Sequence, residues 1–341
     1  MKTEAQPTKT EMQPTRTGSG LFDQYNRRID YFRISVTDRC NLRCLYCMPK
    51  EGIKPKAHSQ ILSYEEIKRF AEAAVAAGVS KIRLTGGEPL VRKDIVKLVG
   101  MLATIPGVAD LALSTNGLLL GEYAAALKEA GLRRVNISLD SLNPEIYQKL
   151  TRFGNVGQVV SGIEKALEFG LKPVKVNTVL LKGLNDDPRD FIKLIYDYPV
   201  HVRFIELMPI SELKNADYFV SIDELKSRLV RYGRLKPAKG PQGAGPAEYV
   251  TLDGALGTIG FISAISNHFC AACNRLRLTP DGKLRACLFS DAEFDIRPVL
   301  RDNYSEKEII ASIRNVLSNK PNRHNISDNG RPKRLMSQIG G

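Results

Sequence analysis

The chain has 341 residues, of which 43% are hydrophobic and 26% are charged, and its formal net charge is +13. This length suits one large α/β domain with an appendage, or two domains, and the composition allows a substantial core. No apolar run approaches the roughly 20 residues that a membrane-spanning helix needs. The Thr- and Pro-rich start has no apolar segment of the kind found in secretory signals. We therefore expect a cytoplasmic protein that makes no contact with membranes.

The excess of positive charge has two interpretations. It can make the surface soluble or give it a loose affinity for nucleic acids, or it can hold a polyanionic small molecule. The overall charge does not decide between them, because the decision depends on where the cations lie.

Residues 1–20 are rich in Thr, Pro, Gln and Lys and are predicted to form a disordered leader. Residues 21–210 then alternate short β-rich runs with helical stretches. The first helix is predicted to begin after Ser63, which forms a capping box with Glu66, and to end at Gly78. The predicted strands are Tyr31–Val36, Lys81–Leu84, Leu111–Ser114, Val135–Leu139, Val174–Leu180 and Val202–Leu207.

This alternation predicts an α/β fold with a parallel sheet, either open or rolled into a partial (β/α)6 TIM-type barrel. In such folds the chemistry collects at the carboxyl ends of the strands. Residues 211–341 differ in character and are predicted to form a C-terminal region. A helix at Ser221–Tyr232 is followed by a Pro/Gly-rich loop at Pro237–Pro246 and by short strands within Glu248–Leu288.

The six cysteines fall into two groups of three. Cys40, Cys44 and Cys47 form the pattern CxxxCxxC directly after the first predicted strand. A structural zinc site usually takes four ligands, and a [4Fe–4S] cluster takes one cysteine for each iron. Three cysteines would leave one iron of such a cluster open to a second ligand. From the spacing alone, a zinc site completed by a distant His or by the other cysteine group stays open as well.

The second group consists of Cys270 and Cys273 in a CxxC pattern and, after thirteen further residues, Cys287. Again three thiolates could hold a [4Fe–4S] cluster with one open iron. His268 could instead complete a zinc site with four ligands.

Two further features give these groups a context. Tyr46 stands before the last cysteine of the first group, and Thr85-Gly86-Gly87-Glu88-Pro89 follows the second predicted strand. With this combination the chain resembles the radical S-adenosylmethionine (SAM) superfamily. The resemblance implies that SAM binds the open iron of the first cluster and that one electron from the cluster yields a 5′-deoxyadenosyl radical.

Over about Phe22 to Gly341 the sequence is similar to one family within it, the MoaA-type GTP 3′,8-cyclases. That family shares the CxxC–x13–C spacing and a terminal Gly-Gly. The other matching stretches are Phe32–Asp38, Lys81–Pro89, Thr115–Gly117, Asn136–Ser141, Lys175–Val179 and Arg203–Met208.

The resemblance implies two [4Fe–4S] clusters, with SAM and GTP held by particular residues. The cluster ligands would be Cys40, Cys44 and Cys47, and Cys270, Cys273 and Cys287. The SAM contacts would be Tyr46, Gly87, Ser138 and Met208, with Arg203 close by. The GTP contacts would be Arg33, Arg83, Ser114, Lys175, Arg275, Leu276 and Arg277. Where the family often has a second threonine before Thr115, this chain has Ser114, which keeps the hydroxyl.

The implied activity is that of a lyase in the first step of molybdenum cofactor biosynthesis. The radical takes the 3′ hydrogen of GTP, the ribose radical adds to carbon 8 of guanine, and one electron and one proton complete 3′,8-cyclo-7,8-dihydro-GTP. The implied partners are an electron donor such as flavodoxin or ferredoxin and a downstream cyclic pyranopterin monophosphate synthase. A homodimer is possible, and no contact with nucleic acid is expected. The Gly340-Gly341 tail of this chain is expected to enter the active site.

Two alternatives remain at this point. A radical SAM enzyme that modifies peptides would also need an auxiliary cluster, but it would leave the Gly-Gly tail unused. A basic zinc protein that binds RNA predicts aromatic platforms for base stacking, whereas this chain has no Trp and scattered aromatic residues.

Overall fold

The structure is a computed structural model. It describes residues 20–210, 213, 215–241, 243, 245–302, 304–324, 326 and 332–340. Almost all of the predicted leader, residues 1–19, and the last glycine, Gly341, lie outside the described residues. Within the described ranges, no helix is long and apolar enough to cross a membrane.

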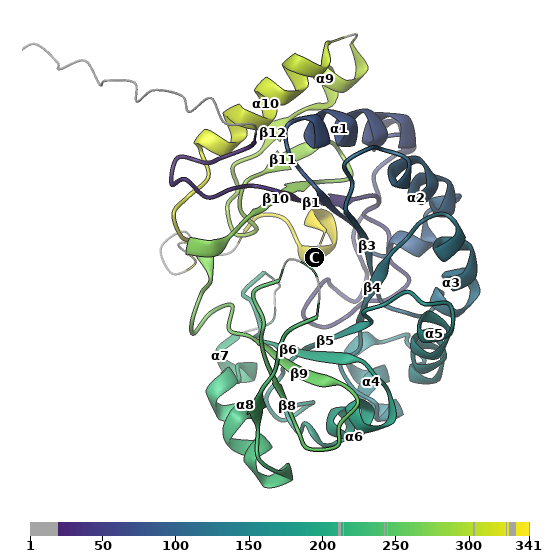
Figure 1. The fold of residues 1–341 in the computed structure, drawn as a ribbon, viewed down its shortest axis with the longest axis vertical. Coiled ribbons are helices and arrows are strands. Elements are labelled where there is room, and N and C mark those ends of the chain that lie inside the picture. The colour runs from purple at the N-terminus through teal and green to yellow at the C-terminus, as the bar shows by residue number, and fades with distance from the viewer. Residues whose placement is uncertain are drawn as a thin grey trace, which may run out of the picture.

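A single curved sheet of twelve strands organises the chain (Figure 1). The order across the sheet is β12-β11-β10-β1-β2-β3-β4-β5-β6-β9-β8-β7. The strands are β1 Tyr31–Ser35, β2 Lys81–Thr85, β3 Asp110–Thr115, β4 Arg134–Ser138, β5 Lys175–Val179, β6 His201–Ile205, β7 Lys236–Pro237, β8 Glu248–Thr251, β9 Thr258–Ile262, β10 Arg275–Leu278, β11 Lys283–Arg285 and β12 Phe294–Asp295. The run from β10 through β1–β6 to β9 is parallel, and the outer strands are antiparallel.

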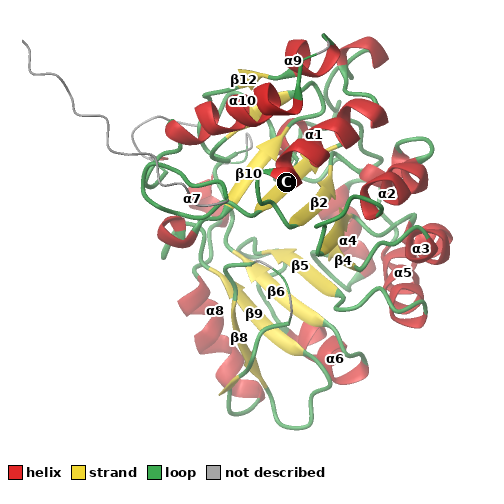
Figure 2. Cartoon of the chain, turned by 45° about the horizontal axis from the view of Figure 1, so that its top comes forward, coloured by secondary structure: helices red, strands yellow, loops and turns green. Residues whose placement is uncertain are grey.

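Most of the helices cover the outer face of this sheet, whereas the short C-terminal helix α12 lies inside the barrel (Figures 1 and 2). The helices are α1 Tyr64–Ala76, α2 Ile95–Ala103, α3 Leu120–Glu129, α4 Pro144–Thr151, α5 Val156–Glu168, α6 Arg189–Asp197, α7 Asn215–Tyr218, α8 Ile222–Leu229, α9 Arg297–Arg301, α10 Glu306–Ser318 and α12 Met336–Ile339. The predicted start of α1 is confirmed, because Ser63 and Glu66 exchange the two hydrogen bonds of a capping box. Phe32 of β1 and Phe70 of α1 meet edge to face at 5.2 Å between ring centroids, in the core between sheet and helices.

The predicted α/β fold with a parallel sheet is confirmed, and the C-terminal region contributes to the same sheet. β10 pairs with β1 and β9 pairs with β6, both in parallel, so each edge of the six-stranded barrel gains a strand. The segments on either side of residue 210 therefore share one sheet, and a domain boundary at that residue stays a prediction. Because the parallel strands all point the same way, the loops that follow them meet on one rim of the barrel.

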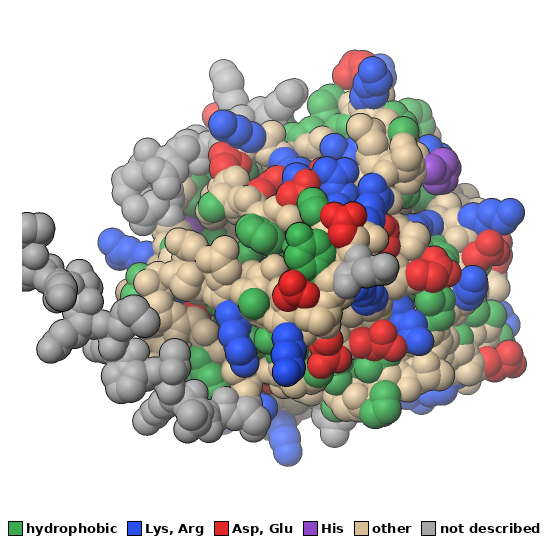
Figure 3. Space-filling model, turned by 90° about the horizontal axis from the view of Figure 1, so that it is seen from above, with side chains coloured by type: hydrophobic (Ala, Val, Ile, Leu, Met, Phe, Trp, Pro, Cys, Tyr) green, Lys and Arg blue, Asp and Glu red, His purple; other side chains and the backbone are tan. Residues whose placement is uncertain are grey.

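Charged side chains of both signs are mixed on the face of the molecule that Figure 3 shows. Lys and Arg side chains there lie among Asp, Glu and apolar side chains, so the described residues of that face form no continuous basic patch. A surface of this kind keeps a protein in solution and gives a long polyanion such as RNA little to follow. A site for a smaller polyanion is therefore expected among the cations inside the barrel.

Candidate active site

The first cysteine group occupies the loop that follows β1. The N–H groups of Cys47 and Met48 donate to the Cys44 carbonyl at 3.0 and 3.2 Å, and Leu42 N–H donates to Cys40 Sγ at 3.4 Å. Burial raises the pKa of all three thiols, that of Cys40 to about 11 and that of Cys47 to about 12, and for Cys44 and Cys47 the charge of neighbouring thiols adds to this effect. Three thiolates this close together need a cationic group among them. Three cysteines in one loop are the donor set of an iron–sulfur cluster that leaves one iron open.

The Gly-Gly-Glu turn after β2 supports this loop through backbone hydrogen bonds. Gly87 N–H donates to the Thr37 carbonyl at 2.7 Å, and Glu88 N–H donates to the Arg39 carbonyl at 2.8 Å. A Cβ atom at Gly87 would overlap the Arg39 carbonyl oxygen. Only glycine allows the turn and the cysteine loop to approach so closely.

The carboxylate of Glu88 is fully buried and ties this turn to the end of β3. It accepts hydrogen bonds from Thr115 Oγ1 at 2.8 Å, Asn116 N–H at 2.6 Å and Leu90 N–H at 3.0 Å. Asn116 in turn points its Nδ2 at Cys40 Sγ, 4.0 Å away. Glu88 therefore positions Asn116 beside the cysteine loop.

Asp140 fixes the aromatic residue of the first cysteine group. Tyr46 Oη donates to Asp140 Oδ2 at 2.7 Å, and Val179 N–H donates to Oδ1 at 2.9 Å. Burial raises the pKa of Asp140 to about 6. Asp140 stands two residues after the end of β4, beside the predicted SAM contact Ser138. Its only sequence signal is that position within the matching stretch Asn136–Ser141.

The second cysteine group is held by cations from distant parts of the chain. Lys320 donates from Nζ to the carbonyls of Arg275 at 2.9 Å and Ala286 at 2.5 Å, close to Cys273 and Cys287. Arg27 donates from Nη1 to the Cys270 carbonyl at 2.8 Å. Neither cation belongs to a sequence motif, so only the structure reveals them.

These cations change the chemistry of the thiols. Burial on its own would raise the pKa of Cys273, but Lys320 and Arg275 lower it to about 7. The thiolate form of Cys273 is thus favoured near neutral pH, and this is the form that binds iron. Cys270, Cys273 and Cys287 line one cavity and supply the same set of three thiol donors as the first group.

A hollow inside the barrel joins this second group to the predicted GTP contacts. Its empty volume, counted out to the open mouth, is about 1160 Å³. Of the predicted site residues, its wall contains Arg33, Arg83, Arg203, Met208, Cys270, Cys273, Arg275, Arg277 and Cys287. We call this space the hollow.

Three arginines that line the hollow lie side by side, in register on adjacent strands. Arg277 of β10 lies beside Arg33 of β1, which lies beside Arg83 of β2. Arg83 and Arg277 are at most 6% exposed, and among the described residues no carboxylate forms an ion pair with either. Burial, with the charge of neighbouring arginines, lowers the pKa of each to about 10. This row of cations is suited to a polyanion.

The remaining predicted residues surround the hollow or the first cysteine group. Lys175 of β5 is buried and lines an adjoining recess with Tyr249, close to Arg83 and Arg203. Ser114 is near the end of β3 and Ser138 ends β4. The Leu276 side chain points away into the hydrophobic core, which leaves only its backbone for a ligand.

The described part of the predicted tail lies inside the barrel, where α12 is yellow in Figure 1. Arg277 Nη1 donates to the Gly340 carbonyl at 2.6 Å, and Ser337 N–H donates to the Cys47 thiol. Gly340 has a φ of +84°, and a Cβ atom there would lie 2.5 Å from Thr85 Oγ1. Only glycine fits both the backbone conformation and the space. Gly341 lies outside the described residues.

Comparison with known families matches both halves of this arrangement. Residues 34–195 match the radical SAM superfamily, and residues 200–326 match the family described as Molybdenum Cofactor Synthesis C. A GTP 3′,8-cyclase of Desulforamulus reducens is 50% identical over 325 residues, which cover 94% of this chain and 100% of that protein. A GTP 3′,8-cyclase of Moorella thermoacetica is 50% identical over 321 residues, covering 94% and 99%.

The chain belongs to the GTP 3′,8-cyclase family. This membership confirms the predicted radical SAM chemistry, with SAM, a first [4Fe–4S] cluster and the second cluster that these cyclases carry. It supports neither the RNA-binding zinc protein nor the peptide-modifying enzyme.

Solved structures with similar folds agree at the level of architecture. Streptococcus suis SuiB bound to S-adenosylmethionine has a TM-score of 0.57 at 13% identity, covering 85% of this chain and 69% of that chain. The enzyme anSMEcpe with bound AdoMet has a TM-score of 0.53 at 15% identity, covering 82% of each chain. At these identities the likeness concerns the fold alone.

Replacing Gly87 with Ala is expected to prevent assembly of the first cluster. The new Cβ would collide with backbone, which no rotamer change relieves, at a cost of about 1–3 kcal/mol in stability. Reconstituted protein should then hold about four irons instead of about eight, at four for each cluster. Iron analysis and thermal unfolding measure both effects.

Gly100→Ala in α2 is the matched control, because a Cβ atom at this position would meet nothing within 4 Å beyond its own helix. It should keep both clusters and gain up to about 1 kcal/mol in stability. Full iron content in the Gly87 variant would show that the close approach is unimportant.

Proposed function

We propose that the hollow is where GTP is bound and cyclised to 3′,8-cyclo-7,8-dihydro-GTP. The observation that carries the proposal is that the row of three arginines and the second cysteine group line one and the same cavity. A nucleoside triphosphate has a suitable group for each: its phosphates can bind the arginines, and its base can bind an open iron of the second cluster. Its ribose then lies between them, where the reaction takes place.

We infer that the triphosphate is held by Arg33, Arg83, Lys175, Arg275 and Arg277. A triphosphate carries up to about four negative charges, and arginine forks bind phosphate oxygens in pairs. Arg83 and Arg277 have no carboxylate partner among the described residues, so phosphates can compensate their charge. Ser114 would add a hydroxyl donor, and Leu276 a backbone contact.

The SAM site is proposed to lie at the rim, beside the first cysteine loop. Tyr46 is fixed by Asp140, and Gly87 brings backbone close to the loop. Ser138 ends β4, and Met208 follows β6 and lies on the wall of the hollow. When bound, the cluster with SAM supplies the 5′-deoxyadenosyl radical. The chain's own contribution is to orient the ribose toward it and to exclude water.

Several partners are proposed on the chemistry of this reaction. Each turnover consumes electrons, so a one-electron donor such as flavodoxin or ferredoxin is needed. The cyclised nucleotide would pass to a cyclic pyranopterin monophosphate synthase. We place these steps in the cytoplasm, without nucleic acid or membrane, and a homodimer is compatible with them.

Reconstituted protein incubated with SAM and reductant is expected to convert GTP, and no other nucleoside triphosphate, to a product of unchanged mass. Deoxyadenosine should form alongside it. Mass spectrometry with nucleotide labelled by deuterium at the 3′ position would show the label in deoxyadenosine. Without conversion of GTP by the intact protein the proposal fails.

The Cys287→Ala variant separates the two cluster sites in the same assay. Because Cys287 lines the hollow and not the first loop, the variant should keep about four irons and bind SAM normally. Cyclised product should be lost. Normal yields would place the guanine elsewhere.

Binding of GTP is expected to take up a proton at Lys175. Burial, with the charges of Arg134 and Arg203, lowers the pKa of the free amine to about 6, so it is mostly neutral at pH 7.5. A neighbouring triphosphate raises that pKa and favours the charged form. GTP affinity should then fall as pH rises above 6, by at most about tenfold for each pH unit.

Titration calorimetry in two buffers of different ionisation enthalpy measures this uptake. The Lys175→Met variant is the control and should lose the proton uptake along with part of the affinity. Equal apparent enthalpies in both buffers for the unaltered protein would contradict the prediction.

A further inference from the structure

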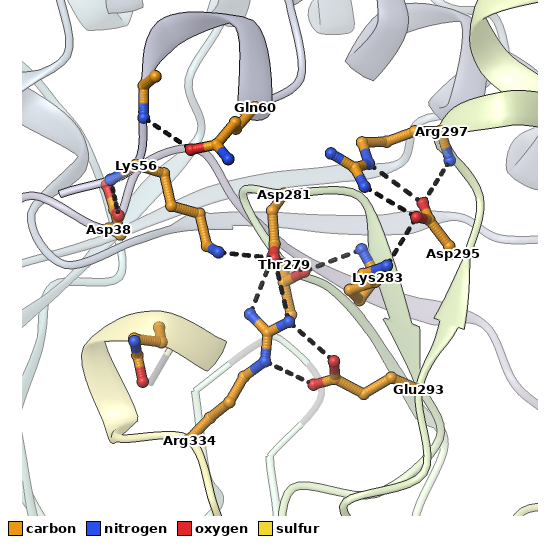
Figure 4. A network of polar contacts seen from close by, with 12 residues as sticks. Asp38, Lys56, Gln60, Thr279, Asp281, Lys283, Glu293, Asp295, Arg297 and Arg334 are labelled. Atoms are coloured by element: carbon orange, nitrogen blue, oxygen red, sulfur yellow. Dashed lines mark hydrogen bonds and ion pairs between the residues drawn. The ribbon is translucent and has the colours of Figure 1, made fainter. Parts of the chain in front are cut away.

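The tail segment, residues 332–340, enters the barrel past a compact group of ion pairs (Figure 4). The Arg334 guanidinium binds Asp281 through Nη1 at 2.9 Å and Nη2 at 3.0 Å. It also binds Glu293 through Nε and Nη2, both at 2.8 Å. Two forked contacts on one arginine fix its position and its direction. We call Arg334, Asp281 and Glu293 the tail clasp.

Both carboxylates of the tail clasp are fixed to the sheet. Asp281 lies in the turn between β10 and β11, where Thr279 Oγ1 donates to it at 2.6 Å. Glu293 precedes β12 and also pairs with Arg285 of β11, which is fully buried. The clasp thus anchors the tail to the strands that carry the second cysteine group.

The residues after Arg334 contact both halves of the site. Ser337 N–H meets the Cys47 thiol, Met336 lies on the wall of the hollow, and the Gly340 carbonyl accepts from Arg277. Met336 and Ser337 belong to α12, a helix of only four residues, Met336–Ile339, and Gly340 follows it. A helix this short has little stability of its own, so its position depends on how its ends are held.

The same clasp is connected to the first cysteine loop. Lys56 Nζ lies 3.2 Å from Asp281 Oδ2, and Lys56 N–H donates to Asp38 Oδ2 at 2.8 Å (Figure 4). Asp38 is two residues before Cys40. One carboxylate, that of Asp281, therefore joins the tail, the turn after β10 and the loop of the first cluster.

We propose that Arg334 is a positioning residue for the cyclisation, because the tail clasp sets where Gly340 and Ser337 lie between the two cluster sites. This inference rests on the proposed function for its effect on product. The placement of the tail itself can be measured without turnover. Arg334 does not line the hollow, so its effect on the reaction would pass through the segments that the clasp holds.

The test replaces Arg334 with Gln in the reconstituted holoprotein. Amide hydrogen exchange within residues 335–340 should become faster by about tenfold or more, because the anchor of α12 is lost. Product formed per deoxyadenosine should fall by about tenfold to a hundredfold, as for a misplaced reacting group. Iron content and SAM binding should remain those of the unaltered protein. A variant lacking Gly340 and Gly341 should show the same loss of product.

Arg297→Gln is the matched control. Arg297 forms a similar forked pair with Asp295 on β12 but makes no contact with the tail among the described residues. It should leave exchange of the tail and product yield unchanged. Arg334→Lys keeps the charge without the fork and should give intermediate values, which guards against a variant that fails to fold.

Unchanged exchange in the Arg334→Gln variant would overturn the anchoring role, whatever the activity. Faster exchange with an unchanged product yield per deoxyadenosine would overturn the positioning role. If the unaltered protein formed no cyclised product, the proposed function would fail while the exchange measurement still decided on the anchor.

Discussion

Repulsion among buried cations is the constraint around which the barrel interior is built. Arg277, Arg33 and Arg83 face one another on three neighbouring strands, and burial makes their charges costly. The opposite faces of the same strands carry Phe32, Leu276 and other buried apolar residues that hold the sheet on its helices. Packing outside the barrel thus stabilises a charged interior that is unfavourable by itself. A bound polyanion relieves this cost, which links ligand binding to stability.

The two cysteine groups are supported by different physical means. Around the first, Gly87 brings backbone close to the cysteine loop, and the buried carboxylate of Glu88 holds the residues that end and follow β3. Around the second, cationic side chains provide the support: Lys320 and Arg27 donate hydrogen bonds to backbone carbonyls at or next to the cysteines. The two cysteine groups thereby receive different electrostatic surroundings.

Local sequence patterns predicted the parts of this molecule that depend on near neighbours. The six inner strands, the capping box at Ser63 and both cysteine groups are each encoded within a few residues. The pairing of β10 with β1 joins segments more than two hundred residues apart, and no periodicity reveals it. Lys320, Asp140 and Arg334 escaped prediction for the same reason. Each is an ordinary charged residue whose role arises only when distant segments meet.

The long-range pairing of β1 also determines when the protein can be completed during its synthesis. One edge of β1 remains without its partner until Arg275–Leu278 has left the ribosome, although β1 is among the first strands to emerge. Contacts so distant in sequence form slowly, and an uncovered strand edge is prone to pair with other chains. The nascent barrel is therefore open on the side where its second cluster belongs. That edge stays unpaired until the last quarter of the chain arrives.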